Sequence, residues 1–511
     1  MRRSIRHCAL LAVLAGALAG SCSGMDFHIS GDGDDANPGT AQRPWRSVER
    51  ANGADLGPGD RLLFRGGERF AGTLRVDESD SGAAGQRVVI GSYGGGRATI
   101  EGGRAGGLVS RNCSHLRVEN LNFVGCGRKE GNAARGIYLE GGADVQVSGV
   151  DISGFREAGL EVAGVRGALI SHVYADENGQ AGIECGGGEP GDLWSSDVRI
   201  EHCIAENNPG NPANLDNHSG NGIVVGQVRG CVIEYCEAMN NGWDMPREGN
   251  GPVGIWAWNA DRVTIQFCVS HHNKSPGWDG GGFDFDGGVT NSVMQYNYSH
   301  DNQGPGYLLC QYWSAPAWKN NVVRYNISVN DGTKTNLGCG IEVISADAGM
   351  SDAEVYNNTV YSERGGAVGF GGRPVPGIRF RNNIFVCGGE TIKGDPSHAR
   401  FEGNCYWSIG ERGFSAQGYS SLKEWAEATG QEMADGKLVG AYVDPRLAQM
   451  GAAPDAKPEE LAGLEAYRLL AGSPCIGAGL EIEDAGGRDF WGNLLRPGRR
   501  PSMGAHEGPR D

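Results

Sequence analysis

Three aspartates within eight residues are the best candidates for chemistry. The run 282–287 places Asp284 and Asp286 between phenylalanines and glycines, and Asp279 lies just before it. If the run is a β-strand, Asp284 and Asp286 share one face, with Cβ atoms about 6.5–7 Å apart. Carboxyl groups about 6.5–9.5 Å apart suit inverting hydrolysis of a glycosidic bond. The pattern predicts that Asp284 and Asp286 share the acid and base roles and that Asp279 assists.

The same oxygen ligands also suit Ca²⁺, so other interpretations stay open. In a Ca²⁺-dependent polysaccharide lyase or a uronate epimerase, the aspartates would hold Ca²⁺ while a Lys or Arg removed a proton from the sugar. The predicted outward strand positions hold no Lys or Arg, and only loop residues would serve: Lys274, Arg324 and Lys334. A third alternative is a non-catalytic solenoid that binds glycans. We expect no cofactor if paired aspartates catalyse hydrolysis. Ca²⁺ is expected only if the protein is a lyase.

Several side chains near the aspartates are predicted to bind a carbohydrate. Trp256 and Trp258 have flat apolar faces that suit pyranose rings, and two outward tryptophans on one strand favour a glycan. His271 and His300 occupy equivalent places in consecutive repeats. They are expected at the edge of the cleft that holds the aspartates. The predicted substrate-binding residues are Trp256, Trp258, Glu184, Glu342, His271, His300, Trp278 and Tyr312.

These residues belong to a repeat that sets their positions. A glycine that opens a short strand recurs at Gly136, Gly159, Gly182, Gly222, Gly254, Gly282, Gly306 and Gly340. After a second strand comes a bend at Val173, Cys203, Cys236, Cys268, Asn297, Asn326, Asn358 and Asn383. Spacings of about 25 to 33 residues are typical of stacked supersecondary units. The sequence therefore predicts an all-β, right-handed parallel β-helix with a continuous interior.

Stacking of the coils predicts which residues are neighbours. The first outward position of successive strands holds Tyr138, Glu161, Glu184, Val224, Trp256, Asp284, Leu308 and Glu342. Neighbouring coils lie about 4.8 Å apart, so Trp256 should flank Asp284, and Glu342 should lie about 9.6 Å away. A polar ladder is expected through Asn178, Asn208, Asn241, Asn273, Asn302 and Asp331. The left-handed conformation is expected at the asparagines of the bend, Asn297, Asn326, Asn358 and Asn383.

Both ends of the repeat resemble a known family. Residues 29–33, 37–40, 57–60 and 64–67 resemble the opening of exported bacterial pectate-lyase-like β-helix proteins, and residues 472–476, 489–492 and 504–507 resemble their closing segment. The resemblance implies the fold over almost the whole mature chain. It does not imply one reaction, because the superfamily includes lyases, glycosidases, epimerases and non-catalytic binders.

The remaining composition limits partners and location. The chain begins with a basic segment, followed by an apolar stretch that leads to Cys22. This pattern predicts an export signal over residues 1–22 and lipidation of Cys22. The protein is then expected in a bacterial periplasm or on the cell surface. We expect a β-helix over residues 26–405 and a cap over residues 406–511 with a short helix near 420–429. A net charge of −17 argues against nucleic acid, and membrane contact is expected only through the lipid. The 14 cysteines are expected to be mostly buried and unbridged.

Overall fold

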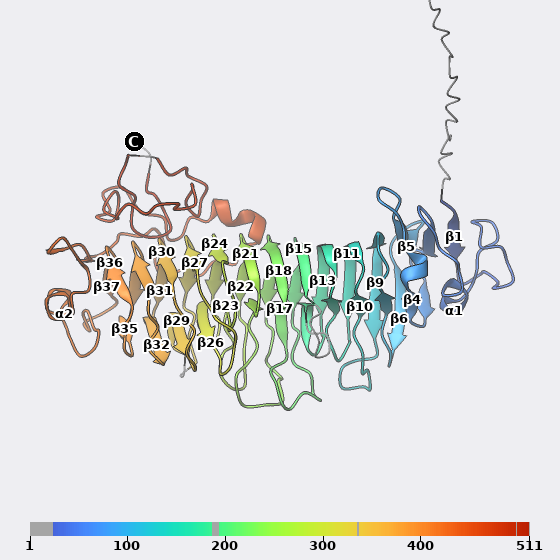
Figure 1. Ribbon diagram of the computed structural model, residues 1–511, viewed down its shortest axis with the longest axis horizontal. Coiled ribbons are helices and arrows are strands. Elements are labelled where there is room, and N and C mark those ends of the chain that lie inside the picture. Colours follow the sequence, from blue (N-terminus) through green and yellow to red (C-terminus); the bar gives the residue numbers. More distant parts are fainter. Residues whose placement is uncertain (1–23, 187–193, 335–336, 497, 510–511) are drawn as a thin grey trace, which may run out of the picture.

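The computed structural model describes residues 24–186, 194–334, 337–496 and 498–509. Over these residues the chain winds into a parallel β-helix, whose coils stack along the long axis of the molecule (Figure 1). This confirms the predicted fold. The predicted signal and Cys22 lie outside the described residues. Among the described helices, none has the length and apolar character needed to cross a membrane.

One face of the solenoid is a 12-stranded parallel sheet, built from one strand of each coil. Its strands are β4 (Leu74–Val76), β7 (Leu108–Arg111), β10 (Ile137–Glu140), β12 (Leu160–Ala163), β14 (Ala181–Cys185), β17 (Asn221–Gly226), β20 (Ile255–Trp258), β23 (Phe283–Phe285), β26 (Tyr307–Gln311), β29 (Cys339–Ser345), β32 (Gly366–Gly372) and β35 (Ile392–Lys393).

The other two faces form one 26-stranded sheet, joined where long strands bend across a corner. Its first half holds β1 (Asp26–Ile29), β2 (Arg61–Arg65), β3 (Arg69–Ala71), β5 (Val88–Tyr93), β6 (Ala98–Gly103), β8 (Leu116–Glu119), β9 (Leu121–Gly125), β11 (Ala143–Ser153), β13 (Arg166–Asp176), β15 (Ser195–Glu201), β16 (Ile204–Glu206), β18 (Val228–Glu234) and β19 (Glu237–Met239). Its second half holds β21 (Asp261–Gln266), β22 (Val269–His271), β24 (Val293–Gln295), β25 (Tyr298–His300), β27 (Asn321–Arg324), β28 (Ile327–Val329), β30 (Ala353–Tyr356), β31 (Thr359–Ser362), β33 (Ile378–Arg381), β34 (Ile384–Cys387), β36 (Arg400–Glu402), β37 (Cys405–Ser408) and β40 (Ala441–Tyr442).

The interior follows from period-two alternation along each strand. Phe283 and Phe285 point inward and are fully buried, while Asp284 points outward between Trp256 of β20 and Leu308 of β26. The whole predicted outward row is confirmed by the register. The stacked Cys203, Cys236 and Cys268 are confirmed as buried, free thiols.

The predicted polar ladder runs along one corner of the solenoid. The side-chain amide of each asparagine donates to the next side chain at 2.8–3.2 Å, from Asn178 through Asn302 to Asp331. The left-handed conformation predicted for the bend asparagines is wrong, because the positive φ belongs to the residue just before each of them, as at Tyr296 and Tyr325. In the ladder, too, the positive φ lies one residue earlier, as at His272 and Asp301. The ladder asparagine then turns inward, where it bonds to buried backbone carbonyls.

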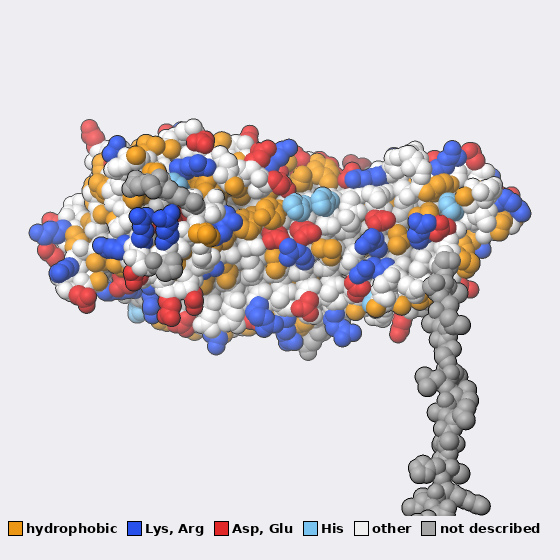
Figure 2. Space-filling model, turned by 90° about the horizontal axis from the view of Figure 1, so that it is seen from above, with side chains coloured by type: hydrophobic (Ala, Val, Ile, Leu, Met, Phe, Trp, Pro, Cys, Tyr) orange, Lys and Arg blue, Asp and Glu red, His pale blue; other side chains and the backbone are white. Residues whose placement is uncertain are grey.

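The C-terminal part closes one end and then returns along a side. The helix α2 (Leu422–Thr429) is capped by Ser421 and lies at the far end of the solenoid. The chain then runs back outside the large sheet, through the short helix η2 (Pro458–Gly463) (Figure 1). Figure 2 looks onto this side of the molecule, where charged and hydrophobic side chains are mixed on the surface. Leu464 and Tyr467 pack there against the outward aromatic rings of the coils, including Tyr298 and Tyr361. The remaining elements are α1 (Val48–Ala51), η1 (Glu78–Asp80), and the hairpin β38 (Met433–Ala434) and β39 (Lys437–Leu438).

Candidate active site

Asp284 is the buried centre of the carboxyl cluster. It points away from the solenoid axis, yet it is only 3% exposed, because loops from neighbouring coils cover it. Its Oδ1 atom has no hydrogen-bond partner among the described residues. Burial, together with the charges of Asp286 and Asp279, raises the pKa of Asp284 well above its ordinary value. The surroundings of Asp284 therefore favour its protonated form, and its unpaired buried oxygen calls for a functional explanation.

Asp286 lies just beyond the end of β23 and is half-buried. Its backbone N–H donates to the Ala257 carbonyl at 2.8 Å, which holds it in line with the strand. Its Oδ1 accepts from the Gly287 N–H at 2.7 Å. Burial raises the pKa of Asp286 to about 6, against the lowering effect of the Gly287 amide and the Cys310 thiol. Asp286 can therefore change its charge near neutral pH while reaching solvent.

Asp279 reaches the cluster from the loop before β23 and is also half-buried. It has a left-handed backbone with φ of 59°, and its Oδ2 accepts from the Gly251 N–H at 2.8 Å. Burial raises the pKa of Asp279 to about 7, assisted by the charge of Asp286 and opposed by the Gly251 amide and Arg247. Two accessible carboxyls with unequal, raised pKa values are the arrangement that acid–base catalysis needs.

The two strand tryptophans differ from the expected sugar platform. Trp256 is only 3% exposed, because Val253 and His218 from two loops cover it and Asn221 accepts from its Nε1 at 3.0 Å. The prediction that Trp256 offers an open face is wrong. Trp258 is half-buried, with its ring against the place where Gly226 lacks a Cβ.

Exposed aromatic faces come from the loops instead. Trp278 is next to Asp279 and 57% exposed, and Trp313 is 66% exposed. The ring of Tyr312 lies over Gly287, where an added Cβ would come within 2.5 Å of it. Burial raises the pKa of Tyr312 to about 12, and the nearby charge of Asp286 adds to this. Tyr312 therefore stands beside Asp286, and Trp278 precedes Asp279 in the chain, whereas the exposed ring of Trp313 lies under the guanidinium of Arg373.

Comparison with known proteins identifies the family of this solenoid. Residues 27–339 match the family described as the Pel9A-like, right handed beta helix region. The chain belongs to the Pel9A-like β-helix family. Lacto-N-biosidase of Bifidobacterium longum subsp. longum is 24% identical in an alignment that covers 95% of this chain and 36% of that protein. The chain therefore spans about a third of the length of that relative.

Two solved structures share the fold of this Pel9A-like β-helix. A GH136 lacto-N-biosidase from Eubacterium ramulus superposes with a TM-score of 0.52 at 20% identity, covering 66% of this chain and 64% of that one. A PL6 family alginate lyase superposes with a TM-score of 0.51 at 14% identity, covering 83% of this chain and 54% of that one. The fold is thus shared by a glycosidase and a lyase, and the reaction has to be argued from the site.

The two predicted glutamates of this Pel9A-like β-helix flank the aspartates at a distance. Glu342 lies two strands beyond Asp284 and is buried across Gly369, with Oε2 unpartnered among the described residues. Burial raises the pKa of Glu342 to about 7 against the charge of Lys393. Glu184 lies three strands before Asp284 and pairs in register with Glu161, which forms an ion pair with Arg135.

The histidines lie elsewhere. His271 and His300 end β22 and β25 of the large sheet and face the C-terminal segment, so the prediction that they edge the aspartate cleft is wrong. Trp318, in the loop after β26, is fully buried, and its Nε1 donates to the Phe285 carbonyl. Period-two reasoning assigns faces within one strand, but it does not say which sheet of a coil a loop residue will join.

Cations near the site also differ from the sequence expectation. Arg324 lies on β27, where it bonds to Tyr356 and the Asp484 carbonyl of the C-terminal segment. Lys334 shares a small pocket with Asp279 and donates to the Ser275 carbonyl. Arg247, which lies close enough to lower the pKa of Asp279, was missed as a cation of the cluster. Cys310 beside Asp286 was also missed, although the repeat places it one coil after Asp286.

Proposed function

We propose that this chain is a glycoside hydrolase that acts on an oligosaccharide. The observation that carries the proposal is the cluster of Asp279, Asp284 and Asp286, in which burial raises all three pKa values. Such a cluster supplies a protonated acid and an ionised base at one pH. The curated relative that aligns with 95% of this chain is named a lacto-N-biosidase, which supports hydrolysis over elimination.

Exposure divides the roles among the three aspartates. Asp286 and Asp279 are half-buried and reach solvent, whereas Asp284 is only 3% exposed. Asp286 has the lower pKa of the two accessible aspartates, so it acts as the base. Asp279 has the higher pKa, so it protonates the leaving oxygen. Asp284 is a positioning residue, whose neutral carboxyl lets Asp286 ionise without a second buried charge beside it.

This division changes the argument about stereochemistry. Inversion was inferred from the two-residue spacing of Asp284 and Asp286, and that spacing does not describe the accessible pair. Hydrolysis is therefore proposed without a choice between inversion and retention. Trp278 and Tyr312 supply the apolar faces that hold the sugar rings, because they are partly exposed aromatics next to Asp279 and Asp286, and Trp313 extends this surface from the position after Tyr312.

The proposal is tested on purified protein with a panel of neutral and acidic oligosaccharides and with an aryl lacto-N-bioside. We expect release of reducing sugar or of the aryl alcohol, without the ultraviolet absorbance of an unsaturated uronate. EDTA should leave the rate unchanged. Accumulation of unsaturated product, lost with a chelator, would instead identify a Ca²⁺-dependent lyase.

A matched control makes the assignment specific. Asp279 and Asp197 are both aspartates with a left-handed backbone, at φ of 59° and 56°, and Asn tolerates that conformation. Asp279→Asn should slow oligosaccharide cleavage at least about 10²-fold, and Asp197→Asn, on the exposed surface away from the cluster, should not. Equal activity of the two variants would show that the carboxyl cluster is not the active site.

A further inference from the structure

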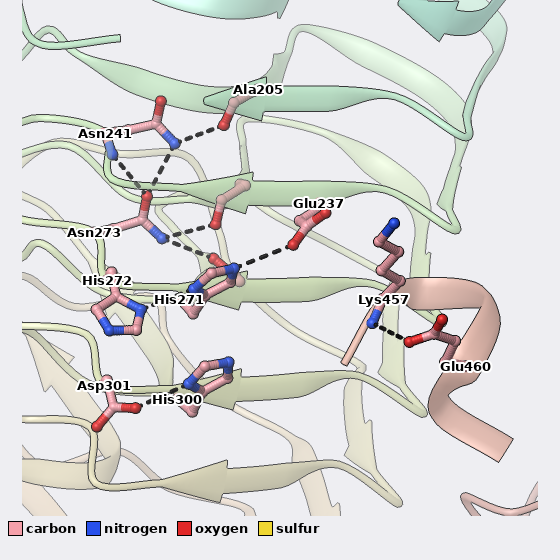
Figure 3. Close-up of polar contacts among 12 residues, drawn as sticks. Ala205, Glu237, Asn241, His271, His272, Asn273, His300, Asp301, Lys457 and Glu460 are labelled. Carbon is pink, nitrogen blue, oxygen red and sulfur yellow. Dashed lines mark hydrogen bonds and ion pairs between the residues drawn. The ribbon is translucent and has the colours of Figure 1, made fainter. Parts of the chain in front are cut away.

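Three histidines gather on the side of the solenoid that the C-terminal segment covers. His271 and His300 are register partners on β22 and β25, and their rings stack with centroids 4.6 Å apart. His272 follows β22 in the left-handed bend, so its ring turns back toward the other two (Figure 3). One ring nitrogen from each histidine lies within 4.8 Å of the others.

We propose that His271, His272 and His300 form a binding site for a divalent transition metal ion, with Zn²⁺ as the representative ion. Imidazole nitrogens are preferred ligands of Zn²⁺, Cu²⁺ and Ni²⁺, and three of them make a sufficient protein set when a fourth position is left open. Nitrogens bound at about 2.0–2.1 Å to a tetrahedral ion lie roughly 3.4 Å apart. The observed nitrogens lie within 4.8 Å of one another, so the rings must rotate to reach that spacing when the ion binds.

The hydrogen bonds of His271 favour this role. Its Nε2 lies 3.1 Å from the Glu237 carboxylate, and its Nδ1 lies 2.8 Å from Nδ1 of His272 (Figure 3). A carboxylate that accepts from one imidazole nitrogen leaves the lone pair of the other free for a metal ion. Glu237 therefore orients His271 as a ligand-supporting carboxylate does in metal sites. One proton between the Nδ1 atoms of His271 and His272 accounts for their short contact, and a bound metal ion would replace that proton.

His300 provides an independent observation. Its side chain is fully buried, and Nε2 has no partner among the described residues, although Nδ1 bonds Asp301 at 2.9 Å. A buried imidazole with one unpaired nitrogen costs free energy unless a ligand, an ion or a water completes it. Asp301 stands beside the cluster as a further oxygen ligand or as the carboxylate that orients His300.

The surroundings suit a cation and leave a way in. A cavity of about 430 Å³ opens beside His271 and His272, between the solenoid and residues 455–460. The carboxylates of Asp301 and Asp455 lie close enough to both His272 and His300 to place negative charge beside the rings. Negative charge beside the imidazoles favours a bound cation. The bound ion would join two coils of the solenoid beneath the C-terminal segment.

The test uses protein purified without a histidine tag, freed of metal with EDTA and then dialysed. Titration with Zn²⁺ by calorimetry and with Co²⁺ by visible absorption should show one equivalent bound, with intense Co²⁺ bands that report nitrogen ligands in a near-tetrahedral site. Addition of Zn²⁺ should also raise Tm. The absence of stoichiometric binding in wild-type protein would overturn the proposal.

Two variants and a control locate the ion. His272→Asn keeps a residue that tolerates φ of 54° and should weaken Zn²⁺ affinity at least about tenfold. Glu237→Gln should weaken it about 10–100-fold, as loss of a supporting carboxylate does. His172→Asn is the control, because His172 is exposed, has φ of 52° and stacks on another histidine, His202. Equal affinity of His272→Asn and His172→Asn would place the ion elsewhere and refute the assignment.

Discussion

Trp256 and Asp284 are register partners on adjacent coils, both point away from the solenoid axis, and both are only 3% exposed. Outward direction and exposure are therefore separate properties in this fold. Val253 and His218, from the loops before β20 and β17, pack on Trp256. Asp279 and Asp286 are half-buried, so they are the aspartates of the cluster that a substrate can touch.

Loss of the proposed acid should depend on the leaving group. Asp279→Asn is expected to lower kcat/KM for an oligosaccharide about 10²–10⁴-fold, because proton donation contributes that much to a typical rate. On an aryl glycoside, whose leaving group needs no proton, the loss should be much smaller. Steady-state kinetics on both substrates measure the difference. Equal losses on both substrates would contradict the assignment of Asp279 as the acid.

The rate should have a bell-shaped dependence on pH. Asp286 must be ionised, which requires a pH above its pKa of about 6, and Asp279 must be protonated, which requires a pH below its pKa of about 7. The maximum of kcat/KM is therefore expected between pH 6 and pH 7, with apparent pKa values that belong to the coupled cluster. Initial rates measured from pH 4 to pH 9 test this. A plateau that extends above pH 8 would exclude an aspartic acid as the proton donor.

Replacing the buried carboxyl group of Asp284 with a neutral amide should stabilise the fold at alkaline pH. The folded pKa of Asp284 is raised above its ordinary value of 3.8, so folded protein holds its proton more tightly than unfolded protein does. Stability is then lost as pH rises from about 4 toward the folded pKa. Asp284→Asn keeps the neutral shape without this loss, and we expect its Tm to exceed that of wild type by about 2 °C or more at pH 8.

The same comparison at pH 4 provides the control. That pH is close to the ordinary pKa of 3.8, so little of the stability loss has developed and the two proteins should unfold at nearly the same temperature. Calorimetry at the two pH values measures the difference. A Tm of Asp284→Asn below that of wild type at pH 8 would mean that the carboxylate is ionised and stabilising, contrary to the direction of its pKa shift.

Exposed and buried tryptophans should respond differently to substitution. Trp278→Ala removes a 57% exposed ring beside Asp279 and should raise KM several-fold while Tm stays unchanged. Trp256→Phe removes the hydrogen bond from Nε1 to Asn221 and leaves the buried Asn221 oxygen without that donor, so it should lower Tm. Kinetics and thermal unfolding of both variants test the contrast. If Trp278→Ala changed Tm and left KM unchanged, Trp278 would not belong to the binding surface.

The sequence alone determined the solenoid and its register. Glycine-led strands, inward Phe283 and Phe285 and the outward row through Trp256, Asp284 and Glu342 are all set by period-two alternation and by the spacing of the repeat, which are local properties. The polar ladder was also predictable, because each coil places an amide at the same corner. These features locate the carboxyl cluster to one strand of one sheet.

Only the tertiary structure decided which of these residues are accessible. The burial of Asp284 and Trp256, the approach of Gly251 and Arg247 to Asp279, and the C-terminal segment over the histidines depend on loops that differ from coil to coil. Loop paths follow from packing between residues far apart in the chain, and no repeat pattern encodes them. His271 and His300 show the consequence, since their place in the repeat was visible while their face of the solenoid was not.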